Sequence, residues 1–342
     1  MLGKKLMQCT ARLRCAMVSA KQTRNLAEIV NLSASEVSRP PDIRGEPAGR
    51  HPAQHPFVKL DFNSPVFTKA LLKVKGRKPR EKHGLILLEG WRLVQEALDC
   101  GCKMDSIFFS RVQDLNKLRL PEDASEMMRL YKVPYNDMKA WSSVTTPPGI
   151  IAICQIPSPV PETRESLPLT VICDQIREPG NLGSIIRNSA GAGVRRVILT
   201  PGCTDLWDGK TLRGAAGAHF KVRVRPNVSW SEIGELVNRE ESRLMLASPA
   251  ASDDGHRPFM RDVPTLQYWE PDYTERHNFI VIGGETEGIS DEAFELAVQT
   301  EGCQVTIPLA NNVESLNSVA AASIIMFEIK KQMMMVRRTD DD

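Results

Sequence analysis

The sequence predicts an α/β protein made of two units, each with alternating strands and helices. Short apolar runs typical of buried strands alternate with amphipathic stretches over residues 61–156 and again over residues 169–335. A linker with four prolines, residues 157–168, separates the two units. This alternation is typical of α/β folds, and 342 residues suffice for two domains with their own cores. Residues 1–60 and the polar tail 336–342 lie outside both units.

Residues 1–60 form a basic, then proline-rich, leading part. Up to residue 82 the chain holds 17 Lys and Arg against six Asp and Glu, and the remaining 260 residues carry a net charge of −9. No acidic residue precedes Glu28, and basic segments without acids are typical of mitochondrial presequences. We therefore expect a presequence and an unstructured linker that direct the protein to the mitochondrial matrix. A basic tail that binds nucleic acid is the alternative.

Composition excludes several other classes of protein. No run approaches 18 consecutive apolar residues, so we expect no membrane span. The eight cysteines are scattered and include no CxxC pair, and the six histidines are dispersed as well. A disulfide framework and a zinc site are therefore not expected, and we assign no metal.

The first unit begins near Phe62 and ends at Gln155. Its stretches LILLEG and IIAICQ are continuous apolar runs typical of buried strands, whereas WRLVQEAL has apolar residues at helical spacing. We expect helices over 66–73, 91–98, 115–118 and 137–142, and strands over 85–90, 106–110, 128–132 and 150–155.

A basic run lies between the first helix and the first strand of this unit. Seven Lys and Arg stand against one acid from Lys69 to Lys82, and we expect residues 75–82 to form a loop. Clustered cations are the usual contacts to RNA phosphates, although a solvated face is the commoner explanation of a charge run. The candidate RNA contacts are Lys73, Lys75, Arg77, Lys78 and Arg80.

The second unit contains six expected strands and ends in a long apolar helix. The strands are expected over 169–173, 194–199, 222–224, 244–247, 279–282 and 305–309. Helices are expected after the first of these strands, over 231–238 and 291–298, and from the end of the polar loop 310–317 to about residue 334. Residues 248–277 are polar and proline-bearing, and we expect an irregular insertion there.

The stretch EPGNLGSIIRNSAGAGV, residues 178–194, follows the first strand of the second unit. Ligand sites of α/β proteins lie at the carboxyl ends of strands. Asn181 stands at the expected start of the helix, where capping is the simplest explanation. Arg187 lies beside the apolar stripe, and a half-buried guanidinium without a nearby carboxylate favours an anion such as a phosphate. The spacing matches neither a dinucleotide-binding motif nor a P-loop.

Two further polar stretches follow later strands. In IGGETEGIS, residues 282–290, glycines let backbone amides approach a ligand, and Glu285 lies at the end of the strand. We interpret Glu287 as a surface acid. The loop within VTIPLANNVESLNSVAAAS, residues 305–323, places Asn and Ser side chains between two apolar elements. They need hydrogen-bond partners, such as a ligand or a second chain, unless Ser315 or Asn317 simply caps the helix.

Together, the order and spacing of these stretches resemble the three motifs of the SpoU/TrmH family, RNA ribose 2′-O-methyltransferases of the SPOUT class. The matching patterns are N-x-G-x-x-x-R from Asn181, G-x-E-x-x-G-I-S from Gly283, and I-P followed by E-S-L-N from Ile307. The resemblance covers roughly Ser64 to Lys331. One departure is SLNSVAAA, where most members have SLNVSxA.

The resemblance implies a fold and a cofactor. The fold is a C-terminal SPOUT α/β domain with a deep trefoil knot, preceded by a small L30e-like substrate-binding α/β domain. The knot would clasp S-adenosylmethionine (AdoMet) mainly through backbone groups. The cofactor-binding positions on this pattern are Gly283, Gly284, Ile307, Leu309 and Leu316.

The resemblance also implies an activity, the methylation of a ribose 2′-OH, on a guanosine of the mitochondrial large-subunit rRNA. The catalytic positions would be Arg187, Asn181, Glu285, Ser315 and Asn317. Arg187 is often described as the general base in this family, but an arginine is effectively always protonated. We therefore expect Arg187 to anchor the substrate and stabilise the developing alkoxide. A tRNA substrate, or an RNA-binding ribosome assembly factor without catalysis, is the alternative.

The Ala-rich final helix is apolar on nearly all faces. Part of that surface is expected to pack within the subunit. In the family this helix also helps to form a homodimer in which the partner completes each site. We expect both uses here.

Overall fold

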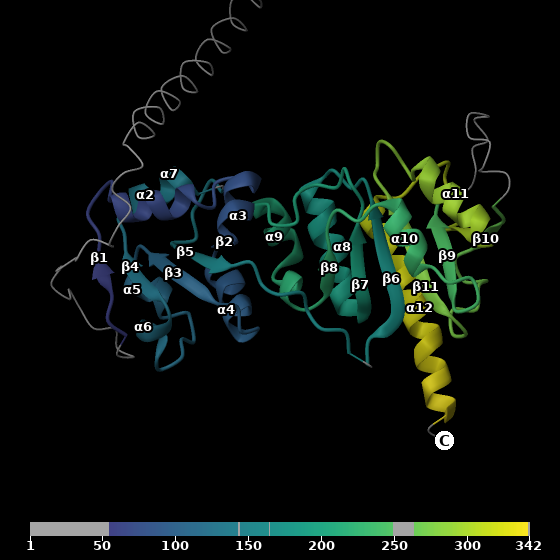
Figure 1. Cartoon of the computed structure of the whole chain (residues 1–342), viewed down its shortest axis with the longest axis horizontal. Helices are drawn as coiled ribbons and strands as arrows, with labels where there is room; N and C mark the ends of the chain where they lie inside the picture. Colours follow the sequence, from purple (N-terminus) through teal and green to yellow (C-terminus); the bar gives the residue numbers. More distant parts are fainter. Residues whose placement is uncertain (1–54, 143, 164, 249–262, 341–342) are drawn as a thin grey trace, which may run out of the picture. The chain divides into compact units, whose positions relative to one another are not determined.

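Two β-sheets organise the part of the chain that the structure, a computed structural model, describes: residues 55–142, 144–163, 165–248 and 263–340 (Figure 1). The expected presequence lies outside these residues, as do most of the expected linker after it and part of the expected insertion at 248–277. The described residues of both sheets pack into one compact body, in which the first unit is built on the first sheet and the second unit on the second.

The first sheet has five strands in the order β1-β4-β3-β5-β2. Strands β1, β4 and β3 are parallel, whereas β5 runs antiparallel to β3 and β2. The strands are β1 (Val58–Lys59), β2 (Leu85–Glu89), β3 (Met104–Phe109), β4 (Arg129–Lys132) and β5 (Ile150–Gln155). The helices are α2 (Pro65–Leu72), α3 (Arg77–His83), α4 (Trp91–Asp99), α5 (Val112–Leu115), α6 (Ala124–Met127) and α7 (Tyr135–Trp141).

Both faces of this sheet are buried, because neighbouring residues of a strand point to opposite faces. Phe109 lies in one cluster with Leu93 and Val94 of α4. Phe108 lies in another cluster with Phe67 of α2 and Met138 of α7. The continuous apolar runs of the sequence therefore correspond to strands covered on two sides.

The second sheet has seven strands in the order β10-β12-β9-β11-β6-β7-β8, and all its pairings are parallel. The strands are β6 (Leu167–Asp174), β7 (Val194–Leu199), β8 (Arg223–Arg225), β9 (Ser242–Ala247), β10 (Thr265–Gln267), β11 (His277–Gly283) and β12 (Cys303–Thr306). The helices are α8 (Pro179–Ala192), α9 (Gly209–Ala215), the 3₁₀ turn η1 (Ala218–Phe220), α10 (Trp230–Leu236), α11 (Asp291–Gln299) and α12 (Ser318–Asp340). The predicted α/β class is confirmed, and the structure adds that this sheet is parallel throughout the pairings described.

Helices cover both faces of the parallel sheet. Val171 of β6 is buried with Ile185 of α8 and Ile325 of α12. The next residue of the strand, Ile172, is buried on the opposite face in a cluster that includes Phe294 of α11. This three-layer arrangement leaves the carboxyl edge of the sheet to the loops that follow β6, β11 and β12.

Several elements differ from the expectations. Residues 77–83 form helix α3 where a loop was expected, because Gly76 and Gly84 supply positive φ angles at the two ends and Pro79 stands in the first turn, where proline is tolerated. Strand β1, helix α9 and η1 were not expected. Strand β10 lies within the segment expected to be irregular.

The last two elements have shifted bounds. Strand β12 ends at Thr306 rather than at 309, since Pro308 cannot donate to a ladder. Helix α12 continues to Asp340, beyond the expected end near 334. The strand order does not by itself trace the threading of the chain, so the trefoil knot stays a prediction.

Candidate active site

Asp174, the last residue of β6, joins the loops at the carboxyl edge of the parallel sheet. It is buried, and its Oδ2 accepts a hydrogen bond from the Ser290 amide at 2.7 Å. Its Oδ1 accepts from the Thr200 hydroxyl at 3.0 Å, and its carbonyl accepts from the Gly284 amide at 3.1 Å. One buried carboxylate thus fixes the loop after β11 against the ends of β6 and β7.

Three of the expected catalytic side chains meet beside this edge. The Asn181 amide Nδ2 donates to Glu285 Oε1 at 3.0 Å. The Asn317 Nδ2 also donates to Glu285 Oε1 and lies 3.4 Å from Asn181 Oδ1. These residues come from α8, from the loop after β11 and from the residue before α12, so the fold brings the three sequence motifs together.

Asn317 also caps α12. Its Oδ1 accepts from the Val319 amide at 3.0 Å while its Nδ2 donates to Glu285. From the sequence, capping of the helix and contact with other polar groups were alternative explanations for this side chain. The amide fulfils both roles, because it carries an acceptor for the cap and a donor for Glu285.

Glycines bring the backbone close together after β11. A Cβ on Gly283 would collide with the Gly288 backbone and lie 2.7 Å from the Ile289 nitrogen, and one on Gly284 would lie 2.8 Å from the Gln175 carbonyl oxygen. These two expected cofactor-binding positions therefore tolerate no side chain. Their backbone lies beside Glu285.

The loop from Ile307 to Asn317 carries the remaining expected positions. Ile307 and Leu316 are half-buried, and Ile307 packs against the core of the sheet. Leu309 and Ser315 are exposed, and Ser315 forms no hydrogen bond with the described residues. On either side of this loop, the buried hydroxyls of Thr306 and Ser318 find no partner among those residues.

Arg187 lies on α8 six residues after Asn181. Its side chain is exposed rather than half-buried, and it forms no hydrogen bond or ion pair within the described ranges. Two ion pairs stand near the start of α8, Arg177 with Glu287 and Lys210 with Glu178. The bond from Lys210 holds the pKa of the exposed Glu178 carboxyl below its usual value.

The five residues expected to contact RNA differ in how exposed they are. Lys73, Lys75, Arg77 and Lys78 are exposed on or before α3, and Lys75 lies 5.0 Å from the centre of the Trp141 ring. Arg80 differs, because only 9% of the residue is exposed.

Comparison with known proteins identifies the family. Residues 168–327 match the SpoU rRNA Methylase family, and residues 67–152 match the MRM3-like substrate binding domain. The chain is 39% identical over 296 residues to "rRNA methyltransferase 3, mitochondrial" of Mus musculus, which covers 76% of this chain and 70% of the relative. The chain belongs to the SpoU rRNA methylase family.

Two further proteins are similar to this chain at lower sequence identity. "23S rRNA (guanosine(2553)-2'-O)-methyltransferase RlmP" of Bacillus subtilis is 28% identical over 258 residues, covering 75% of this chain and 93% of that one. The AdoMet-bound rRNA methyltransferase from Sinorhizobium meliloti superposes with a TM-score of 0.65 at 22% identity, over 80% of this chain and 98% of that one. The latter likeness shows a common fold.

Sequence reasoning missed several residues of this SpoU site. Asp174 directly follows the expected strand 169–173 and was not singled out, and neither were Thr200 and Ser290, which hydrogen-bond to it. The signal was the acid that closes the apolar run LTVICD, because a charged residue at the end of a buried strand needs partners.

The described residues contain no group of three His, Cys, Asp or Glu placed to hold a metal ion. Among the helices in those ranges, none has the length and apolar character needed to cross a bilayer.

Proposed function

We propose that this protein transfers a methyl group from AdoMet to a ribose 2′-OH in the large-subunit rRNA of mitochondria, and that it acts in the matrix. The observation that carries the proposal is the meeting of Asn181, Glu285 and Asn317, with Arg187 exposed on the same helix as Asn181 and without a partner among the described residues. Membership of the SpoU family and the mitochondrial name of the mouse relative support it. The name of the Bacillus subtilis relative supports a guanosine as target.

The chain offers suitable groups for AdoMet. Gly283 and Gly284 let the backbone after β11 fold closely on itself next to Glu285, and Ile307, Leu309 and Leu316 supply apolar walls for an adenine. The Thr306 and Ser318 hydroxyls, which have no hydrogen-bond partner among the described residues, supply polar groups at the two ends of the same loop. When bound, AdoMet supplies an electrophilic methyl group on a sulfonium centre.

Arg187 is assigned to the RNA. Its guanidinium is exposed and offers a planar set of donors that fits a phosphate. Arg187 would also stabilise negative charge on the attacking ribose oxygen. The ribose and the loop would be oriented by the other four expected catalytic residues, Asn181, Glu285, Ser315 and Asn317. Most of the catalysis would then be positioning.

The exposed cations Lys73, Lys75, Arg77 and Lys78 are assigned to the RNA backbone. Such contacts supply affinity without reading a base sequence, so the choice of nucleotide depends on how the RNA is held relative to Arg187.

We also propose a homodimer through α12. Ala320, Ile324, Phe327 and Met334 are exposed and recur at helical spacing along one side of this helix. A twofold contact between two copies would bury the same stripe on both chains.

The proposal is tested by AdoMet titration calorimetry and by mapping 2′-O-methyl groups on mitochondrial RNA with and without the protein. One rRNA position should lose its methyl group when the protein is absent. Arg187→Ala and Arg187→Lys should both bind AdoMet normally and both lose methyl transfer. Full rate with Lys at 187 would contradict the planar anchor, loss of a tRNA methyl would make tRNA the substrate, and absence of AdoMet binding would favour a non-catalytic assembly factor.

A further inference from the structure

The segment from Asp205 to Lys221, which includes α9 and η1, is buried against the first sheet's unit. Leu212 and Phe220 belong to the same core cluster as Ile86 and Leu88 of β2. Trp207 packs against that cluster and lies 5.3 Å from the His219 ring. The two units therefore share apolar core through this segment, besides the linker that joins them in sequence.

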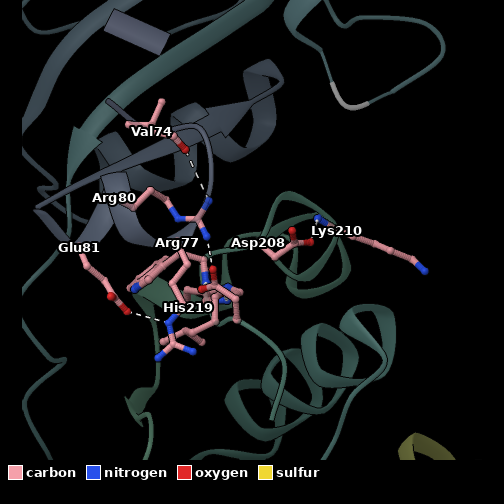
Figure 2. A network of polar contacts seen from close by, with 10 residues as sticks. Val74, Arg77, Arg80, Glu81, Asp208, Lys210 and His219 are labelled. Carbon is pink, nitrogen blue, oxygen red and sulfur yellow. Dashed lines mark hydrogen bonds and ion pairs between the residues drawn. The ribbon is translucent and has the colours of Figure 1, made fainter. Parts of the chain in front are cut away.

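Arg80 ties α3 to the beginning of this segment (Figure 2). Its Nη1 donates to the Val74 carbonyl at 3.5 Å, and its Nη2 donates to the Asp205 carboxylate. The other Asp205 oxygen accepts from the Trp207 amide at 2.9 Å. A buried guanidinium requires such partners. The ion pair therefore holds the turn before α9 against α3.

A second contact joins α4 to η1. Glu96 pairs with Lys221 at 2.6 Å and raises the pKa of that amine. Gly217, with a φ of 88°, lies so close to α4 that a Cβ there would stand 2.8 Å from the Glu96 Cβ.

The opposite side of α9 packs on α8, the helix that carries Asn181 and Arg187. A Cβ on Gly183 of α8 would collide with the Thr211 carbonyl oxygen and lie 2.8 Å from the Ala215 nitrogen. A Cβ on Gly214 would lie 3.2 Å from the Gly180 carbonyl oxygen. Backbone therefore meets backbone between α9 and α8, within a few residues of Asn181 and Arg187, and the contact leaves little room for one helix to move alone.

We propose that Arg80 is a positioning residue, which fixes the RNA-holding surface of α3 relative to Asn181 and Arg187 through Asp205 and α9. This inference rests on the proposed function. Lys75, Arg77 and Lys78 on the same segment hold the RNA, whereas Arg80 sets where the held RNA presents its ribose. Loss of the Arg80–Asp205 pair leaves the exposed cations in place, so RNA still binds but its ribose is misplaced.

The test uses the full chain with Arg80→Gln, Arg80→Lys and Asp205→Asn. Gln and Asn remove the ion pair, and Lys retains it in weaker form. We expect kcat at saturating rRNA fragment to fall about tenfold to a hundredfold for Arg80→Gln and Asp205→Asn, since a misplacement of about 1 Å has effects of that order. The KM for RNA and the Kd for AdoMet should stay within about threefold, Arg80→Lys should recover most of kcat, and sequencing should show methylation spreading to neighbouring nucleotides.

Two controls separate the possible roles of charge. Arg77→Ala removes an exposed cation from the same helix, whose side chain pairs with Glu81 at 2.7 Å, and should raise the KM for RNA without lowering kcat. Arg119→Gln removes a cation that is 79% exposed and paired with Asp99, and should change neither value.

Each outcome decides the proposal. A rise in KM alone for Arg80→Gln would make Arg80 an RNA contact, and wild-type kcat with a single methylated nucleotide would overturn any positioning role. If Arg80→Gln fails to fold, Asp205→Asn and Arg80→Lys still give the kcat and site measurements. A wild-type protein that methylates no RNA would refute the proposed function instead, and the coupling between residues 80 and 205 would then be measured by a double-mutant cycle on unfolding.

Discussion

At the scale of single residues, Asn317 connects the stability of α12 to the polar group of the site. Its amide oxygen accepts the capping hydrogen bond and its amide nitrogen donates to Glu285, so one side chain contributes both to helix stability and to the site. The neighbouring pair Ser318 and Val319, which departs from the family pattern, leaves this geometry possible: Ser318 is buried and Val319 packs against the core. Substitution of Asn317 can separate its two roles.

Asn317→Asp keeps an acceptor for the cap, removes the donor and sets a carboxylate beside Glu285. We expect the free energy of unfolding to stay within about 1 kcal/mol of the wild type, because Asp is a good N-cap. Methyl transfer should fall by on the order of a hundredfold, as when a single oriented polar group is lost from an active site. Chemical denaturation and transfer of a labelled methyl group give the two values.

Asn317→Ala is the matched control, because it removes cap and donor together. It should lose about 1 kcal/mol of stability in addition to activity. An Asp variant as active as the wild type would show that the amide donor is dispensable.

At the scale of elements, the contact between α8 and α9 depends on the absence of side chains. Gly183→Ala should destabilise the fold by about 1–3 kcal/mol, the usual cost of overpacking, and should also lower kcat because α8 carries Asn181 and Arg187. Gly191→Ala on the same helix is the control. A Cβ at Gly191 meets nothing within 4 Å, so alanine there should stabilise the helix by about 0.5–1 kcal/mol.

Thermal unfolding of both variants checks this prediction. Equal melting temperatures for Gly183→Ala and the wild type would mean that the two helices separate without cost. Such a result would also weaken the proposed coupling through α9.

The elements show what the sequence could and could not predict. Strands such as 150–155 and the three site motifs were predictable, because apolar periodicity and motif spacing are local properties. Helix α3 could not be predicted from apolar periodicity, because its seven residues are mostly charged and form almost no apolar stripe. Helix α9 was not predicted for a different reason. Its buried residues divide between two partners, since Leu212 packs on the first unit and Ala215 on the second, so the sequence shows no single apolar stripe.

The role of Arg80 was unpredictable for the same physical reason. In the sequence it belongs to a run of cations, and its partner Asp205 lies 125 residues further along the chain. Only the fold distinguishes one buried guanidinium from its exposed neighbours.

At the scale of the whole molecule, stability should depend on pH through His219. Burial lowers the pKa of this ring to about 4, although its hydrogen bond with the Leu206 carbonyl acts in the opposite direction. The unfolded chain binds a proton near pH 6.5, whereas the folded protein does so only near pH 4, so the free energy of unfolding should fall as the pH drops through this window. The contribution lost is about 3 kcal/mol.

Denaturation at a series of pH values checks the slope, and His219→Gln should flatten it. Glutamine lacks a titrating group and retains a donor for the Leu206 carbonyl. Identical slopes for variant and wild type would show that other groups, such as His277 with its similarly lowered pKa, cause the dependence.

The proposed dimer would form through the exposed side of α12. Ile324, Phe327 and Met334 are 36%, 48% and 46% exposed, and Lys331 stands in the same row, paired with Glu328. Phe327→Glu should convert the dimer to a monomer, since an unpaired carboxylate within an apolar contact costs several kcal/mol. Val298→Glu places the same charge on an exposed apolar position of α11 and should leave the dimer intact. Light scattering after size exclusion gives the masses. If the partner completes each site, the monomer produced by Phe327→Glu should also lose methyl transfer, and a fully active monomer would refute that part of the proposal.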